Sequence, residues 1–321
     1  MPVLDEDQFA ELSERHRREL QVHSYRMLGN LEQAEDAVQE ALLRAWKGRA
    51  SFAAPSADWG PGARAWLYRI VTTTCFDVLR AAQRRAQRLE SIADVPWLQP
   101  YPDSLLDETQ AAGPEGSAIR RETVELAYLA VIQLLPARQR AVLLLRDVQG
   151  YSAAETAAIL ELTVAAVTSA LQRARATLAG QVTAREAGWS PDGITDADRA
   201  LLAAFIAAHE RQDPVAGLAV IRADVRIAMP PNPVLFTGRD AVAGLMAHAY
   251  DRSVFGDWKL LPTAANRMPA AASYLRRTGT AAYLPFKLDV LRTGAGQIAE
   301  ITTFDASLFS RFGLPPELPA E

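Results

Sequence analysis

Apolar residues recur every three or four positions over much of the first 180 residues. This spacing begins at Phe9 and returns over 31–47, 63–85 and 119–179. A period near 3.6 predicts amphipathic helices. Gly29-Asn30 interrupts the first of them, and an asparagine there is expected to cap the helix that follows. The two prolines within 48–62 predict a loop.

The pattern changes beyond about residue 190. Between Phe286 and Val290 apolar residues alternate with charged ones, which is the period of a half-buried strand. This part of the chain is therefore expected to mix helices and strands. The expected helices cover about 195–212, a short segment after it and 239–250, and the expected strands lie near 225–229, 258–262, 283–292 and 297–304.

Two stretches without periodicity separate the patterned regions. Residues 89–118 hold four prolines and several acids, which predicts an extended linker, and the segment 188–193 marks a second boundary. This composition fits a flexible tether. The expected organisation is a helical domain over 1–88, a linker over 89–118, a helical domain over 119–180, a linker over 181–194 and an α+β domain over 195–321.

Composition fits a globular protein of two or three domains. The chain has 321 residues, of which 49% are hydrophobic and 22% charged. We expect neither a membrane span nor a signal peptide, because no run of 18 apolar residues and no basic, then apolar leader is present. Cys75 is the lone cysteine and is expected to be a buried, inert thiol. The cytoplasm is the expected compartment.

Charge is unevenly distributed, although the net charge is only −4. Six arginines between 63 and 88 accompany a single acid, Asp77, whereas all four charged residues between 31 and 40 are acidic. A basic segment beside an acidic one predicts two different partners, one of them polyanionic.

The most specific local pattern lies between Leu135 and Leu178. Ser152 and Glu155 predict a capping box at the start of a short helix, and a turn over 161–163 precedes a longer helix. Two helices joined by a short turn are typical of a helix-turn-helix, whose second helix enters the major groove of DNA. An ordinary helical hairpin with solvated arginines fits the spacing equally well. The expected inner stripe is Val164, Val167, Leu171, Ala174 and Leu178, and the expected DNA-facing residues are Ala165, Thr168, Ser169, Gln172, Arg173 and Arg175.

Several motifs, in this order along the chain, resemble the extracytoplasmic-function sigma factors of bacterial RNA polymerase. The matching residues are Tyr25 to Asn30, Ala34 to Glu40, Arg64 to Ile70 with Cys75 and Asp77, Leu135-Pro136 with Gln139-Arg140, and Gly150 to Ser152 with Glu155 and Arg173 to Arg175. The resemblance covers about residues 9 to 180. The combination is highly specific, although no single motif is.

The resemblance implies a role for each helical segment. Core RNA polymerase, through its β′ clamp helices and β flap, and promoter DNA are the implied partners. The helix over 31–47 would bind the polymerase through Glu35, Asp36, Gln39 and Glu40. The helix over 63–85 would recognise and open the minus-ten element through Arg64, Arg69, Thr72, Thr73, Arg80 and Arg84. Thr73 stands where family members often carry asparagine, and the loop over 48–62 is long, so the base preference stays open. The linker would thread the polymerase cleft, where its acids could mimic nucleic acid, and a merely flexible tether fits its composition equally well. The helix-turn-helix would read the minus-thirty-five element.

Residues from about 195 onward resemble the SnoaL-like cone fold, in which a curved antiparallel sheet wraps helices. The matching pieces are the helix ending at His209-Glu210, Gly238 to Val242, Phe286 to Val290 and Ile298 to Phe304. His209, His248 and Asp289 are the available acid/base groups, but no pair has a spacing that demands catalysis. No cofactor, metal site or enzymatic role is expected. The resemblance is consistent with a small molecule or a protein that binds this domain as a signal.

The sequence therefore predicts two all-α sigma domains and a C-terminal α+β SnoaL-like domain that modulates them. Two alternatives remain at this point. A one-component regulator would bind DNA without polymerase and gives no reason for the acidic helix. An enzyme would carry its activity in the C-terminal domain alone.

Overall fold

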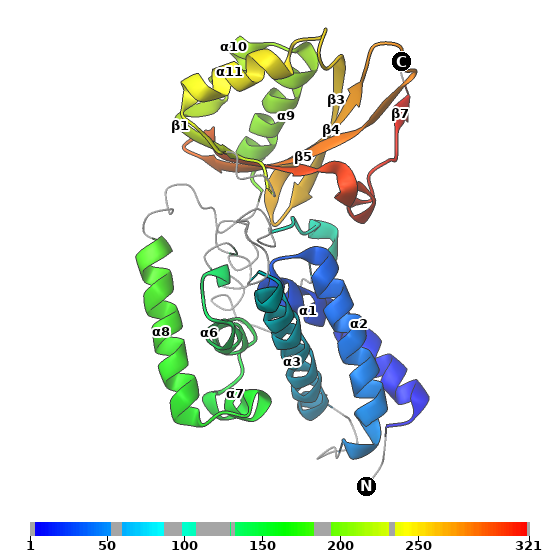
Figure 1. Ribbon diagram of the computed structural model, residues 1–321, viewed down its shortest axis with the longest axis vertical. Helices are drawn as coiled ribbons and strands as arrows, with labels where there is room; N and C mark the ends of the chain where they lie inside the picture. The colour runs from blue at the N-terminus through cyan, green and yellow to red at the C-terminus, as the bar shows by residue number, and fades with distance from the viewer. Residues whose placement is uncertain are drawn as a thin grey trace. The chain divides into compact units, whose positions relative to one another are not determined.

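A computed structural model describes residues 4–52, 60–86, 98–106, 129, 132–182, 194–230 and 235–319. The chain divides into two compact units, one formed by residues 1–99 with 105–184 and the other by residues 100–104 with 185–321. Figure 1 labels the helices and strands of both units.

The first unit begins with three long helices, α1 (Glu6–Leu28), α2 (Leu31–Gly48) and α3 (Gly60–Ala86), with a short 3-10 turn η1 (Arg49–Ser51) after α2. Gly29 ends α1 in the left-handed conformation, with a φ of 71°, and its N–H donates to the Tyr25 carbonyl over 2.7 Å. The Asn30 side chain accepts from the Gln33 N–H and caps α2, as the sequence predicts.

Among the described residues, four further segments belong to the first unit. They are α6 (Ala137–Leu143), the π-helical segment η4 (Leu144–Val148), α7 (Ala153–Leu160) and α8 (Val164–Val182). The predicted capping box is confirmed, because Ser152 and Glu155 exchange hydrogen bonds at the start of α7. Glu161 takes the left-handed conformation, with a φ of 53°, and ends α7. The helix-turn-helix anatomy predicted from the sequence is therefore present.

The helices of the first unit pack through two clusters of buried residues. In one cluster Met27 of α1 and Cys75 of α3 meet apolar residues of α6 and α8. In the other, Tyr68 of α3 meets Leu145 and Tyr151. The expected burial of Cys75 is confirmed, and burial raises the pKa of its thiol to about 12.

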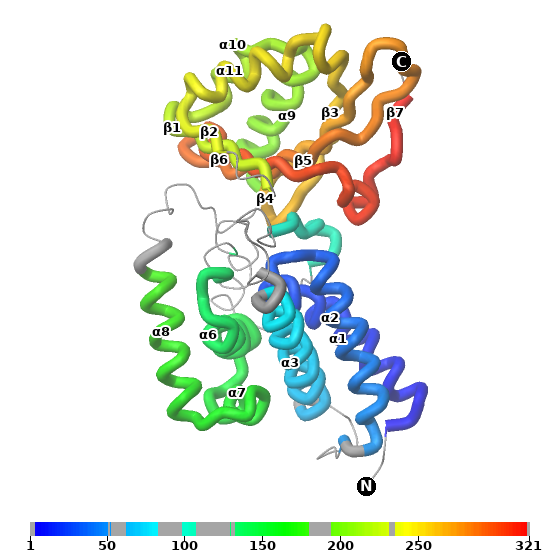
Figure 2. The backbone as a smooth tube through the Cα atoms, viewed as in Figure 1, coloured from blue at the N-terminus to red at the C-terminus, as the bar shows by residue number. Residues whose placement is uncertain are grey.

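The second unit is α+β. Its helices are α9 (Asp196–Arg211), α10 (Pro214–Ala219) and α11 (Arg239–Ala249), with a 3-10 segment η5 (Ala306–Phe312). The strands are β1 (Ile221–Ala228), β2 (Leu235–Thr237), β3 (Asp257–Ala265), β4 (Met268–Arg276), β5 (Ala282–Gly294), β6 (Gln297–Asp305) and β7 (Leu318–Pro319). The sheet order is β2-β1-β6-β5-β4-β3, with β7 paired to β5. Figure 2 follows the backbone as the curved sheet wraps α9.

Two expectations for the second unit are corrected. The sheet was expected to be antiparallel but is mixed. The strands β1 and β6 pair in parallel, and all other strand pairs of the sheet are antiparallel. The sequence pattern also missed β4, which lies between β3 and β5 and has all but its last residue buried. A strand covered on both faces shows no alternation of apolar and polar residues, so the pattern gives no signal there.

The linker residues 100–104 belong to the second unit. A two-residue turn joins β3 to β4, and both of its residues, Asn266 and Arg267, have positive φ. Tyr101 and Asn266 form two hydrogen bonds, from the Tyr101 N–H to Asn266 Oδ1 over 2.7 Å and from the Asn266 N–H to the Tyr101 carbonyl over 2.9 Å. The Arg267 N–H donates to Asp103 Oδ1 over 2.7 Å. The short turn η3 (Asp103–Leu105) follows.

No single described helix is long and apolar enough to cross a membrane. The segments 153–160 and 164–179 reach that length and composition only as a pair, and the pair is bent by 100°.

Candidate polymerase and promoter interfaces

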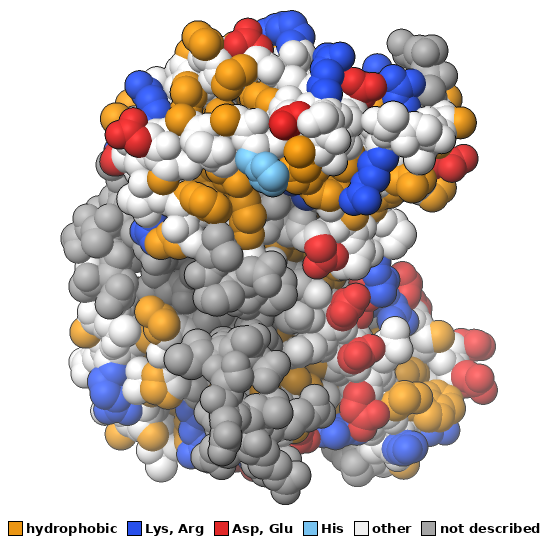
Figure 3. Space-filling view, turned by 45° about the horizontal axis from the view of Figure 1, so that its top comes forward, with side chains coloured by type: hydrophobic (Ala, Val, Ile, Leu, Met, Phe, Trp, Pro, Cys, Tyr) orange, Lys and Arg blue, Asp and Glu red, His pale blue; other side chains and the backbone are white. Residues whose placement is uncertain are grey.

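The acidic face of α2 is built by an amphipathic pattern. Ala34, Val38 and Ala45 are buried against the neighbouring helices, which turns the polar positions outward. Asp36, Gln39 and Glu40 are exposed, and Glu35 is half-buried. Acidic side chains gather on the part of the first unit where α1 and α2 lie (Figure 3). The four predicted polymerase contacts therefore follow one another along one helix.

Arg44 joins this face to α3. Its guanidinium donates to Glu40 on its own helix and to Asp77 of α3, both over 2.8 Å. These hydrogen bonds lower the pKa of Asp77, with Arg44 as the main cause. Arg80, a predicted DNA contact, forms an ion pair with the other oxygen of Asp77 and stays largely exposed.

Arg64 lies at the centre of a polar cluster. Its Nη2 donates to Glu19 of α1 over 2.7 Å and to Gln149 over 3.0 Å. The guanidinium also lies over the rings of Tyr68 and Tyr151. Burial raises the pKa of Glu19, but the hydrogen bonds from His16 and Arg64 outweigh it and bring the pKa to about 2. Arg64 is therefore already engaged by protein groups.

The other predicted minus-ten contacts differ in their exposure. Arg69 is exposed and forms an ion pair with Glu161, which lies in the turn of the helix-turn-helix. Thr73 is exposed, and its hydroxyl donates to the Arg69 carbonyl over 2.8 Å. The Arg84 side chain lies outside the described residues.

Thr72 is buried, unlike its neighbours. Its Oγ1 lies 2.9 Å from His23 Nε2, and neither side chain is exposed. Burial lowers the pKa of His23 to about 3, so its ring is neutral. A contact between Thr72 and a DNA base requires α3 to be uncovered first.

The outer face of α8 matches the sequence expectation in its exposure. Ala165, Thr168, Ser169, Gln172, Arg173 and Arg175 are all exposed. Arg175 also pairs with Asp147 over 2.6 and 2.9 Å. Val164 corrects the predicted inner stripe, because it starts the helix and is 49% exposed, while Val167, Leu171, Ala174 and Leu178 are buried.

Sequence reasoning gave no structural role to three polar side chains that hold the two helical modules together, although Arg140 is part of a family motif. Glu19 and Gln149 bind Arg64, as described above. Arg140 is buried and donates to the carbonyls of Gln133 and Leu135, as well as to that of Met27. Burial lowers the pKa of Arg140 to about 10. Periodicity does not reveal the contacts of Arg64 with Glu19 and Gln149 or of Arg140 with Met27, because these partners are far apart in the sequence.

Residues 12–85 match Sigma-70 region 2, and residues 125–178 match Sigma-70, region 4. The ECF RNA polymerase sigma factor SigG of Mycobacterium tuberculosis is 38% identical over 325 aligned residues, which cover 97% of this chain and 85% of SigG. The chain belongs to the ECF sigma factors. The ECF sigma factor SigM of Mycobacterium tuberculosis is 35% identical over 53% of this chain and 75% of SigM.

The fold of this sigma factor is also similar to a solved structure over nearly the whole chain. The crystal structure of the extracytoplasmic-function sigma factor SigJ of Mycobacterium tuberculosis covers 96% of this chain and 99% of its own, with a TM-score of 0.62 at 21% identity. The predicted fold class, helical sigma domains followed by an α+β domain, is confirmed. The family consists of transcription initiation factors, so a one-component regulator and an enzyme are not favoured.

The C-terminal unit of the sigma factor brings two of its three predicted acid/base groups to one cavity. His209 of α9 and Asp289 of β5 both line it, whereas His248 of α11 does not. His248 is exposed and packs edge-on against Phe255. The described residues contain no group of three side chains suited to a metal ion.

Proposed function

We propose that this sigma factor binds core RNA polymerase through the acidic face of α2 and reads a two-part promoter with α3 and α8. The exposure of Asp36, Gln39 and Glu40 on one helix supports the first contact, because acidic side chains suit a basic partner surface. The exposed hydroxyl, amide and guanidinium groups of α8 support the second, because such groups bind base edges and phosphates.

We further propose that the compact first unit is a closed form of the protein. Its two DNA-reading modules share buried clusters, and Arg69 of one pairs with Glu161 of the other. The minus-ten and minus-thirty-five elements are centred roughly 25 base pairs apart, or about 85 Å at 3.4 Å per base pair. Modules in direct contact do not span that distance on straight DNA, so the modules separate before both elements are bound.

The hydrogen bonds between the linker and the β3–β4 turn support a restraining role for the C-terminal domain. Residues 100–104 come from the segment that joins the two DNA-reading modules. While Tyr101 and Asp103 bind the turn, this part of the linker is not free to enter a polymerase cleft. This observation carries the proposal that the C-terminal domain modulates the sigma factor by holding its linker.

Charge reversal on α2 tests the polymerase contact. Replacing Asp36 and Glu40 with lysine places two positive charges against a basic surface, so retention of the full chain by core polymerase is expected to fall at least tenfold. Reversal of Glu11 and Glu14, which are exposed on α1, is the matched control and leaves retention unchanged. Equal retention of both double variants contradicts the assignment.

Release of the linker tests the restraining role. Asn266→Gly keeps a residue that tolerates positive φ but removes the acceptor for the Tyr101 N–H, and Asp103→Ala removes the acceptor for the Arg267 N–H. The double variant is expected to raise promoter-specific run-off transcription several-fold. Ala295→Gly also places glycine at a positive-φ turn position, between β5 and β6, but removes no hydrogen-bond acceptor, and it serves as the control. Unchanged or lower output from the double variant refutes the role.

A further inference from the structure

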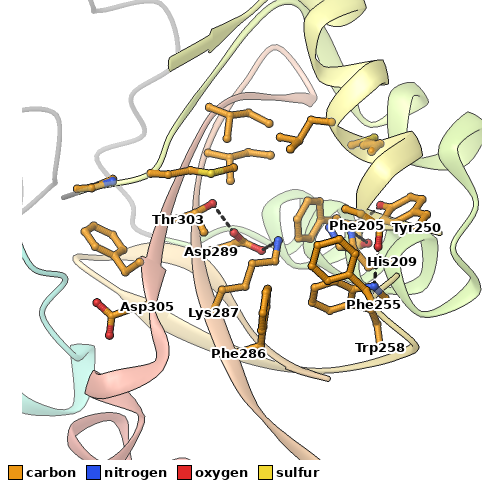
Figure 4. A pocket seen from close by; sticks show the side chains of 18 residues that line it. Phe205, His209, Tyr250, Phe255, Trp258, Phe286, Lys287, Asp289, Thr303 and Asp305 are labelled. Atoms are coloured by element: carbon orange, nitrogen blue, oxygen red, sulfur yellow. Dashed lines mark hydrogen bonds and ion pairs between the residues drawn. The ribbon is translucent and has the colours of Figure 1, made fainter. Parts of the chain in front are cut away.

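The C-terminal unit contains a partly open cavity of about 360 Å³ between its helices and the concave side of the sheet. Aromatic side chains form one wall, since the rings of Phe255, Trp258 and Phe286 lie with their centroids 5.2 to 6.0 Å apart (Figure 4). Aliphatic and methionine side chains of β1, β6 and α11 add to the lining. The volume lies at the lower end of the range of about 300–1,000 Å³ for small-molecule sites.

Two of the three charged side chains that line the cavity, Lys287 and Asp289, neutralise each other, and the third, Asp305, is exposed. Asp289 is fully buried and accepts a hydrogen bond from the Thr303 hydroxyl over 2.6 Å. Lys287 Nζ lies 2.7 Å from its other oxygen, and Figure 4 shows the three side chains joined. A charged ligand would compete with this pair and leave one of its members buried and unpaired, which is costly. The arrangement therefore favours an uncharged ligand.

His209 offers one nitrogen for such a ligand. Its Nδ1 lies 3.1 Å from the Phe205 carbonyl and 3.0 Å from the Tyr250 hydroxyl. The His209 side chain lines the cavity and is only 6% exposed. Its Nε2 nonetheless makes no hydrogen bond to the described residues. Burial also keeps the ring neutral by lowering its pKa to about 3. Nε2 is therefore either a donor or an acceptor, depending on the tautomer.

We propose that this cavity binds an uncharged, mostly apolar ring compound whose single hydroxyl group pairs with His209 Nε2. A hydroxyl both donates and accepts, so it satisfies Nε2 in either tautomer. The ring system lies against Phe255, Trp258 and Phe286, where offset and edge contacts stabilise aromatic groups. This inference does not rest on the proposed role of the linker, because binding is measured without transcription.

Three naphthalene derivatives test the chemistry on the full chain by isothermal titration. 2-Naphthol carries the hydroxyl, naphthalene lacks it and 2-naphthoate adds a negative charge. 2-Naphthol is expected to bind about three- to tenfold more tightly than naphthalene, as one net hydrogen bond allows. 2-Naphthoate is expected to bind more weakly than 2-naphthol. The absence of saturable 2-naphthol binding, equal affinities for 2-naphthol and naphthalene, or tightest binding of 2-naphthoate overturns the proposal.

Two variants locate the site. His209→Phe is expected to abolish the advantage of 2-naphthol over naphthalene while naphthalene still binds, and His248→Phe is the matched control outside the cavity. Ala249→Phe fills the cavity and is expected to lower the affinity for both compounds at least tenfold, with an unchanged circular dichroism spectrum. The site is refuted if His209→Phe still binds 2-naphthol more tightly than naphthalene by the wild-type ratio. It is also refuted if Ala249→Phe binds both compounds with wild-type affinity, because binding would then occur elsewhere.

Discussion

Glu19 lies outside the sequence motifs that identified the sigma modules, yet it holds the best-connected arginine of α3. It accepts hydrogen bonds from Arg64 and His16, and Arg64 reaches Gln149 of the second module at the same time. Acidic side chains seldom lie so deep without a partner. The ion pair therefore links α1, α3 and the second module at one point, and its geometry arises only when distant segments come together.

Acid is expected to remove the contribution of Glu19 to stability. Its folded-state pKa of about 2 lies below the ordinary value of 4.5, so its contribution is complete above pH 4.5 and is lost as the pH falls toward 2. Between pH 6 and pH 3 the free energy of unfolding should fall by about 2 kcal/mol more in the wild type than in Glu19→Gln. Urea unfolding at both pH values measures this difference.

Glu14→Gln provides the comparison for that measurement. Glu14 pairs with Arg17 on the exposed face of α1, with 77% of its side chain accessible, and such pairs contribute little. The free energy of unfolding of Glu14→Gln should change between pH 6 and pH 3 by the same amount as that of the wild type. A Glu19→Gln variant with the same pH dependence as Glu14→Gln would contradict the assigned role of Glu19.

At the scale of elements, local signals predicted the helices well. The Gly29-Asn30 break, the capping box at Ser152 and the turn after Leu160 all depend on neighbouring residues, and each is present. The strand β4 had no such signal. Its segment 269–272 is proline followed by three alanines, residues with low strand propensity, and the strand forms because β3 and β5 flank it.

The residues of the candidate site also fall into two groups, those that local sequence patterns predicted and those that they did not. The outward positions of α8 follow from helical periodicity, and all six are exposed. The burial of Thr72, however, results from contacts with His23 on another helix, and the linker segment at Tyr101 binds a turn 165 residues away. Periodicity within one segment contains no information on such partners. Their identification required the folded structure.

Gln172 tests the reading face of α8. Its side chain is exposed and offers both a donor and an acceptor, which suits a base edge in the major groove. Gln172→Ala is expected to weaken transcription from promoters that depend on the minus-thirty-five element by about five- to 100-fold, as a loss of 1–3 kcal/mol implies. Run-off assays on promoters with and without that element measure the effect.

The control for Gln172 lies on the same helix. Thr177 is exposed, but its hydroxyl donates to the Arg173 carbonyl over 3.0 Å and its position lies outside the predicted face. Thr177→Ala should leave transcription nearly unchanged. Equal losses in both variants, or a loss in Gln172→Ala that does not depend on the minus-thirty-five element, would exclude a base-reading role.

At the scale of the whole molecule, the closed form that we propose for the first unit implies that the contacts that stabilise it oppose its activity. Tyr68 and Tyr151 meet edge to face with ring centroids 5.6 Å apart, in the same buried cluster as Leu145 of η4 and Ile159 of α7. Arg64 and Arg69 form hydrogen bonds or ion pairs with protein groups instead of phosphates. Under this proposal, binding of polymerase and promoter supplies the free energy that separates the modules.

Separation of the modules is measurable by energy transfer between labels. Cysteines introduced at the exposed positions Glu32 and Thr177 accept the two dyes, whereas Cys75 reacts little because it is buried and its thiol pKa is about 12. Efficient transfer is expected in the free chain. Addition of core polymerase and promoter DNA should nearly abolish it, because about 85 Å of duplex separates the two promoter elements.

Tyr151→Ala should move the free chain toward this open form. Loss of the ring removes its contacts with Tyr68 and Arg64, while the exposed residues of α8 remain intact. A buried aromatic residue replaced by alanine costs about 3 kcal/mol, which shifts a closed-to-open equilibrium by roughly 100-fold toward the open form. Transfer in the free variant should therefore fall below that of the wild type. Equal transfer in both proteins, or undiminished transfer in the promoter complex, would show that the modules act without separating.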